Sequence, residues 1–151
     1  MFDSLLTEQV LQTGLLSLGV HCLLYCLFAY ILPDGPWSKL PSYTAHQAVS
    51  LPLMIYVSYQ GILAWFFNPQ LSEFDTSEAR IKTLTEEGMH IAEFVFGFLL
   101  FWDIPVSLMT PVLNDALMMA HHIGMLFISG KNNVYFEHDG FVNPFGHFLM
   151  K

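Results

Sequence analysis

Four apolar stretches with few charged residues dominate the chain. They run from about Gln9 to Leu32, Ser42 to Phe67, Gly88 to Met109 and Val112 to Ser129. An α-helix rises 1.5 Å per residue, so about 20 residues cross a hydrocarbon core of ~30 Å. The first three stretches are long enough to do so and the fourth is barely long enough. The pattern predicts an all-α, polytopic membrane protein with about four transmembrane helices.

The polar breaks between these stretches predict how the chain is organised. A PDGP turn ends the first stretch, so we expect residues 1–32 to form an N-terminal transmembrane helix. Residues 33–129 should form a second unit of three helices, with a polar loop at 68–87. Asn, Gly and Pro interrupt every later apolar run, so residues 130–151 are expected to be a polar C-terminal tail.

The positions of the basic residues predict a topology. Four spans would place the amino terminus, the long loop and the tail on one side of the membrane. The bases on that side are Arg80, Lys82, Lys131 and Lys151. The opposite side has only Lys39, so the positive-inside rule places both termini inside. The opening segment carries Asp3 and Glu8 and no base, unlike a cleaved signal peptide, so we expect the first helix to be retained.

Composition supports a membrane location and excludes one class of partner. Apolar residues make up 54% of the chain and charged residues 12%, and the mean hydropathy is +0.48. Thirteen acids against five bases give a net charge of -8, which leaves no basic surface for a nucleic acid. Membrane lipids are therefore the expected surroundings. An organelle membrane is expected, and the mitochondrial inner membrane, a plastid membrane and the endoplasmic reticulum fit equally well.

Ionisable residues within the apolar stretches are the candidate functional residues. Such a residue at the centre of a spanning helix costs on the order of 2.5–3.5 kcal/mol, so it is normally retained for a partner or a task. Counted from the helix centres, His121 and His122 lie near the bilayer midplane and Asp103 lies roughly 7 Å away. We therefore expect Asp103 to be buried against His121 or His122. His46 and Asp115 lie further out on the same side, where a polar pocket would open.

Two other polar features have simpler interpretations. A single intramembrane histidine such as His21 usually forms a hydrogen bond with a neighbouring helix. Glu86, His90 and Glu93 share one helix face, but a carboxylate-bridged metal site needs a second matching pair of residues. We interpret this stripe as a solvated helix end and expect no metal site.

Two segments resemble a known family. WSKLPSYTAHQAVS is similar to the Trp-then-Ser/His segment of the TLC family, the membrane domain of ceramide synthases and translocating-chain-associating membrane proteins. FLLFWDIPVSLMTPVLNDALMMAHHIGMLFIS resembles its aromatic-Asp pair followed by a double histidine in the next helix. The resemblance covers about Trp37 to Ser129. The matching residues are Trp37, His46, Ser50, Trp102, Asp103, His121 and His122.

The resemblance implies a fold and an activity. The fold would be the first part of the TLC helical barrel. In ceramide synthases the family transfers an acyl chain from acyl-CoA to a sphingoid amine, so Asp103, His121 and His122 would be catalytic. Acyl-CoA would then be a substrate, and no cofactor is expected. The family domain continues with further helices after the double histidine, whereas this chain continues into a polar tail.

That departure separates three hypotheses. We expect a non-catalytic accessory subunit of a larger membrane complex, for example a respiratory or photosynthetic one, whose other transmembrane subunits cover the polar face. The first alternative is a ceramide-synthase-like lipid N-acyltransferase. The second is a lipid-binding or lipid-sensing membrane protein, with His46, Asp103, Asp115, His121 and His122 lining its pocket.

Overall fold

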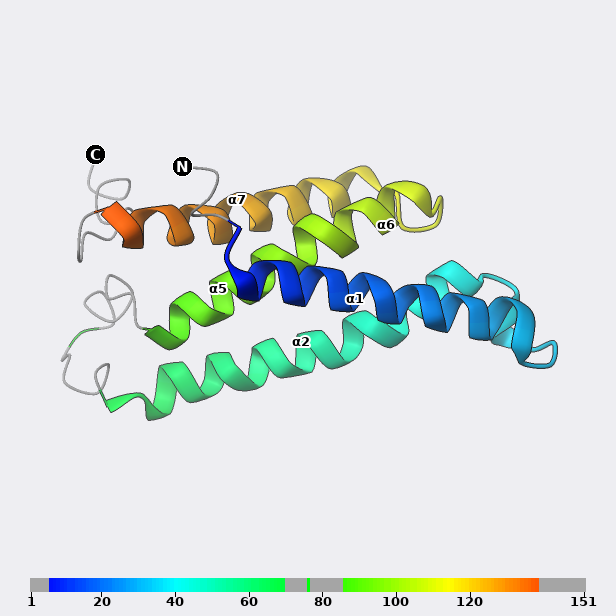
Figure 1. Ribbon diagram of the computed structural model, residues 1–151, viewed down its shortest axis with the longest axis horizontal. Helices are drawn as coiled ribbons and strands as arrows, with labels where there is room; N and C mark the ends of the chain where they lie inside the picture. Colours follow the sequence, from blue (N-terminus) through cyan, green and yellow to red (C-terminus); the bar gives the residue numbers. More distant parts are fainter. Residues whose placement is uncertain (1–5, 70–75, 77–85, 139–151) are drawn as a thin grey trace.

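The computed structural model describes residues 6–69, 76 and 86–138, and these residues form helices and no strand (Figure 1). The prediction of an all-helical chain is confirmed for this part. The helices are α1 (Glu8–Cys26), η1 (Leu27–Ile31), η2 (Pro36–Ser38), α2 (Pro41–Phe67), α5 (Glu86–Phe98), η3 (Leu99–Asp103), α6 (Ile104–Met109) and α7 (Ala116–His138). Most of the loop at 68–87 and the tail beyond His138 lie outside the described residues.

Three helical segments are long and apolar enough to cross a membrane. They are Glu8–Ile31, Pro41–Phe67 and Glu87–Met109, and Ala116–Gly130 is a shorter apolar helix. Successive segments run in opposite directions. The same end of the bundle therefore holds the start of α1, the end of α2, the start of α5 and the end of α7 (Figure 1). This is the arrangement that an even number of spans would give.

Small residues bring α1 and α5 into close contact. The buried residues of α1 are Val10, Gly14, Ser17 and His21, which form one stripe along the helix. A Cβ atom on Gly14 would lie 2.6 Å from the carbonyl oxygen of Gly97 and from Cβ of Phe101. Glycine at this crossing therefore lets the two backbones approach. Such close packing of small residues is how helices associate inside a membrane, where the hydrophobic effect does not drive their association.

A wide helical turn positions Trp102 and Asp103. The helix that starts as α5 changes to π-helix over η3 and returns to α-helix in α6. Pro105 lies two residues after the end of η3 and has no N–H to donate to the preceding turn, a local cause of such an irregularity. Trp102 and Asp103 are consecutive, yet both are buried, at 0% and 4% exposed. The turn thus aims two neighbouring side chains into the bundle.

The fourth apolar helix differs from its predicted bounds at both ends. It begins at Ala116 rather than near Val112, because the backbone N–H groups of Leu113 and Asn114 donate to the carbonyl of Thr110 and close a turn. It continues to His138 rather than ending near Ser129. A Cβ atom on Gly130 would lie 2.8 Å from the Phe96 ring, so this glycine permits packing instead of ending the helix.

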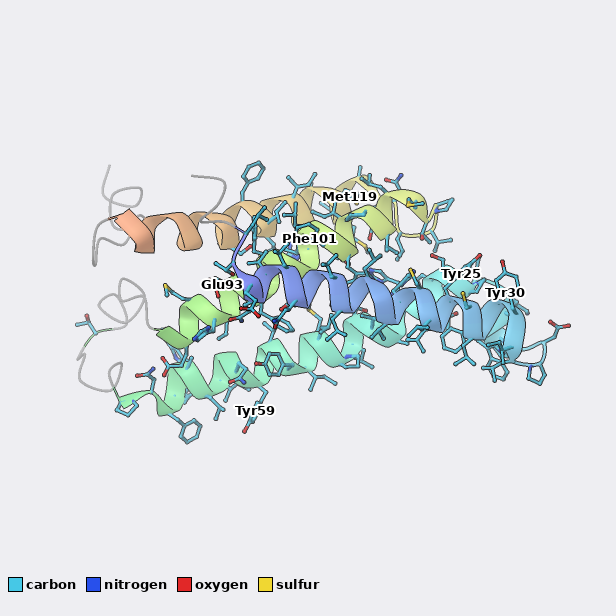
Figure 2. All side chains as sticks on the ribbon, in the orientation of Figure 1. Tyr25, Tyr30, Tyr59, Glu93, Phe101 and Met119 are labelled. Carbon is cyan, nitrogen blue, oxygen red and sulfur yellow. The ribbon has the colours of Figure 1, made fainter. Side chains whose placement is uncertain are left out.

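The segment formed by α5 and η3 lies at the centre of the bundle. It contacts α1, α2 and α7, while α2 and α7 have little direct contact with each other in the described part of the chain. A groove between α2 and α7 therefore has α5 and η3 as its floor. The outer faces remain apolar: Tyr59 on α2, for example, is 58% exposed and points away from the bundle (Figure 2). Such faces are suited to lipid or to other transmembrane helices.

Substitution of Gly14 tests the close helix crossing. We expect Gly14→Ala to lower the free energy of unfolding by about 1–3 kcal/mol, because the neighbouring atoms are backbone and Cβ and cannot move aside cheaply. Gly19→Ala on the same helix is the control, since a Cβ there meets nothing within 4 Å. It should be neutral or stabilise by up to ~1 kcal/mol. Thermal unfolding in detergent measures both, and equal effects would contradict the crossing.

Candidate functional site

The candidate site is centred on Asp103, whose carboxylate meets two histidines from different helices. His46 Nε2 on α2 lies 2.7 Å from Asp103 Oδ1 and forms a buried hydrogen bond with it. His122 Nδ1 on α7 lies 2.5 Å from Asp103 Oδ2, in a close contact that departs from the ideal hydrogen-bond direction. The side chains of His46 and Asp103 are each 6% exposed. Asp103 therefore bridges the two walls of the groove from its floor.

Trp102 supports this bridge from the side. The rings of His46 and Trp102 stack with their centroids 4.9 Å apart and their planes 22° apart. His21 on α1 approaches the same indole, at 6.3 Å between centroids. Phe98 also packs against Trp102, so the indole is fixed and in turn fixes the orientation of the His46 ring.

A cavity of about 290 Å³ lies beside the bridge and occupies the groove between α2 and α7. Its polar lining comes from His46, Gln47, Ser50, Asp103, His121 and His122. Its apolar lining comes from Met54, Val57, Val95, Phe98, Leu99, Trp102, Leu113, Met118 and Met125. The cavity is thus mostly apolar, with a cluster of acid and imidazole groups in its wall, as is common for small-molecule sites.

The structure brings together four of the five predicted site residues. Asp103 and His122 pair as expected, which confirms the prediction that Asp103 is buried against one of the adjacent histidines. His121 lines the cavity, and its ring centroid lies 5.8 Å from that of His122. His46 was placed further out by counting along the helix, but it contacts Asp103 directly.

Asp115 has a different role from the one expected. Its Oδ1 accepts hydrogen bonds from the backbone N–H groups of Leu117 and Met118, at 3.0 and 3.1 Å. It is absent from the cavity lining. Asp115 therefore caps the start of α7, where the positive end of the helix dipole also stabilises its carboxylate.

The structure also places the other two polar features, His21 and the stripe of Glu86, His90 and Glu93. His21 is buried at 6% exposed, but its Nδ1 has no hydrogen-bond partner in the described part of the chain, so the expected interhelical bond from this atom is not formed. His90 is exposed and its Nδ1 donates to Oε1 of Gln9. Glu93 lies 3.9 Å from the His90 ring, and the side chain of Glu86 lies outside the described residues.

The contact with Asp103 orients the ring of His122. Asp103 holds the Nδ1 side of His122, so the opposite ring nitrogen can act as a base or accept a hydrogen bond from a ligand. Among the described residues, no group of three or more His, Cys, Asp or Glu side chains is arranged to hold a metal ion.

Comparisons of the chain with protein families, with curated proteins and with solved structures find no match.

Removing either histidine tests whether the bridge holds the bundle together. We expect His46→Ala and His122→Ala each to lower the free energy of unfolding by about 1.5–3 kcal/mol, because each leaves a buried carboxylate oxygen without its partner. His121→Ala is the control, since His121 is exposed and the described contacts of Asp103 do not include it. Thermal unfolding in detergent compares the three variants. A loss in His121→Ala as large as in the other two would contradict the assignment.

Proposed function

We propose that this chain is a TLC-like integral membrane protein that binds a membrane lipid in the groove between α2 and α7 and does not itself catalyse acyl transfer. The observation that carries the proposal is the cavity of about 290 Å³, with its apolar walls and its Asp103–His122 pair. Ligand cavities are roughly 300–1,000 Å³, so this one has room for a single lipid segment.

The lining favours a lipid over a water-soluble ligand. Methionine, phenylalanine and tryptophan supply five of the nine apolar lining residues, and methionine adapts its shape to flexible apolar ligands. Ser50 and Gln47 on α2 add polar groups near Asp103, so a headgroup or a carbonyl could accept hydrogen bonds there. A lipid would lie with its apolar part along the methionines and its polar part toward the bridge.

The bridge itself argues for a structural use of the two histidines. Both oxygens of Asp103 are engaged, one by each helix, so the carboxylate holds α2 and α7 at a fixed separation. The outer faces of α1, α2 and α7 carry many exposed large apolar side chains. We extend the proposal to an accessory role: in the membrane, other transmembrane subunits cover part of these faces in a larger complex.

A second candidate, a lipid N-acyltransferase, is favoured by one specific observation. Asp103 meets Nδ1 of His122, and a carboxylate in that position orients an imidazole so that its other nitrogen can act as a general base. That nitrogen would activate a sphingoid amine for attack on the thioester of acyl-CoA. The amide would form, and the thiol of coenzyme A would leave with the proton.

Filling the cavity tests the lipid-binding proposal. Met125→Trp places a bulkier side chain among the lining residues and should weaken the affinity for lipid about tenfold, equivalent to about 1.4 kcal/mol, so that less lipid co-purifies. Ile123→Trp is the control, because Ile123 is exposed on the same helix and outside the lining. Native mass spectrometry of the protein in a mild detergent measures the bound lipid. Equal lipid retention in both variants would contradict the proposal.

An activity assay separates the two candidates. The purified chain is given acyl-CoA and a sphingoid base, with His122→Ala as the comparison. We expect no turnover from either protein. Turnover by the parent chain that disappears in His122→Ala would establish the acyltransferase instead.

A further inference from the structure

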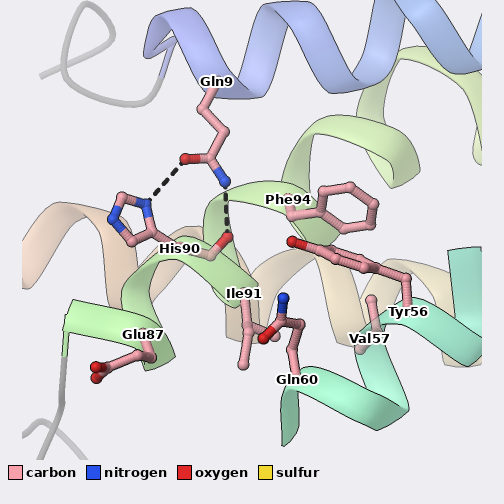
Figure 3. A pocket seen from close by; sticks show the side chains of 8 residues that line it. All are labelled: Gln9, Tyr56, Val57, Gln60, Glu87, His90, Ile91 and Phe94. Carbon is pink, nitrogen blue, oxygen red and sulfur yellow. Dashed lines mark hydrogen bonds between the residues drawn. The ribbon is translucent and has the colours of Figure 1, made fainter. Parts of the chain in front are cut away.

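A second cavity, of about 340 Å³, lies where α1 and α5 begin, between them and α2 (Figure 3). It is separate from the Asp103 site and shares only Val57 with it. Its lining residues are Gln9, Tyr56, Val57, Gln60, Glu87, His90, Ile91 and Phe94. Gln9 and Glu87 belong to the first turns of their helices, so the cavity faces the level of the lipid headgroups rather than the bilayer centre.

Specific contacts hold the walls of this cavity in place. Gln9 Nε2 donates to the carbonyl oxygen of His90 at 3.0 Å, and His90 Nδ1 donates to Oε1 of Gln9 at 2.9 Å (Figure 3). This two-bond clamp joins α1 to α5. Asn68 Nδ2 donates to Oε2 of Glu87 at 2.8 Å, which joins the end of α2 to α5. The cavity is therefore bordered by three helices, and α1 and α2 are each tied to α5 beside it.

The chemistry of the lining favours a cation. The rings of Tyr56 and Phe94 lie against each other with centroids 5.0 Å apart, and they present aromatic surface to the cavity (Figure 3). Glu87 borders the cavity with its carboxylate turned away from Tyr56 and Phe94 and bonded to Asn68 (Figure 3). His90 also lines the cavity, and none of the lining residues is Lys or Arg. Aromatic faces and a carboxylate both attract an ammonium group, whereas they oppose a phosphate. Gln60 adds an amide that can bond a polar part of the same ligand.

We propose that this cavity binds the ammonium headgroup of a membrane lipid. The ammonium group lies against Tyr56 and Phe94, Glu87 adds a longer-range attraction from the same cavity lining, and the acyl chains leave along the apolar surface of α2. The phosphate of such a zwitterionic lipid points away from Glu87, toward the aqueous surface. This site is independent of the lipid proposed for the groove between α2 and α7.

The test measures the melting temperature of the full chain in maltoside detergent while short-chain lipids are added. Dihexanoyl phosphatidylcholine should stabilise the protein more than dihexanoyl phosphatidylglycerol, which has no ammonium group. Tyr56→Leu should raise the concentration for half-maximal stabilisation about tenfold, and Glu87→Gln should raise it by a smaller factor because its carboxylate acts at longer range. Tyr56→Phe keeps the aromatic face and should retain most of the response, which separates loss of the site from loss of folding.

Two matched variants and one further ligand complete the experiment. Tyr59→Leu and Glu8→Gln remove an exposed tyrosine and an exposed acid outside the cavity, and both should respond like the parent chain. Equal stabilisation by the two lipids, or equal loss of response in the control variants, would overturn the proposal. A response to free choline as strong as that to the phosphatidylcholine would also overturn it, because the ligand would then be a soluble ammonium compound.

Discussion

The carboxylate of Asp103 is the polar group on which the arrangement of the helices depends. It is 4% exposed inside an apolar bundle, where an unpaired carboxylate would cost several kcal/mol. His46 from α2 and His122 from α7 meet its two oxygens, so the cost is offset only when both helices are in place. Because α2 and α7 have little other contact in the described part of the chain, this bridge is their main direct connection across the groove.

Local features of the backbone make the bridge possible. The π-helical turn of η3 directs Trp102 and Asp103 inward together, and Trp102 then stacks on His46. On the opposite side, Gly14 allows α1 to press against α5, which supports the floor of the groove. The groove and the cavity in it are thus consequences of one irregular turn, one close crossing and one buried acid. A lipid would therefore bind in a groove that is already formed, and a preformed site loses less entropy on binding.

Hydrophobic length alone was enough to predict the helices, but their ends depend on local bonding. The helical segments that correspond to the first three apolar stretches begin and end within one or two residues of the predicted bounds, because so few charges interrupt these stretches. The start of α7 was missed because Asp115 caps it after a turn at Thr110, and its continuation past Gly130 depends on contact with Phe96. Depth along the helices correctly paired Asp103 with one of the two adjacent histidines, His121 or His122, and His122 makes the contact. It misjudged His46, because counting residues describes neither the course of α2 nor the wide turn at Asp103.

Asp103 is expected to hold α2 and α7 at a fixed separation through its contacts with His46 and His122. A direct test places spin labels on Tyr59→Cys of α2 and Phe127→Cys of α7, two exposed positions, after Cys22 and Cys26 are changed to Ser. The distance distribution is then measured by double electron–electron resonance in lipid nanodiscs, with Asp103 present and with Asp103→Leu. The account predicts one narrow distance in the first protein and a broadened or shifted distribution in the second. An unchanged narrow distance in Asp103→Leu would contradict it.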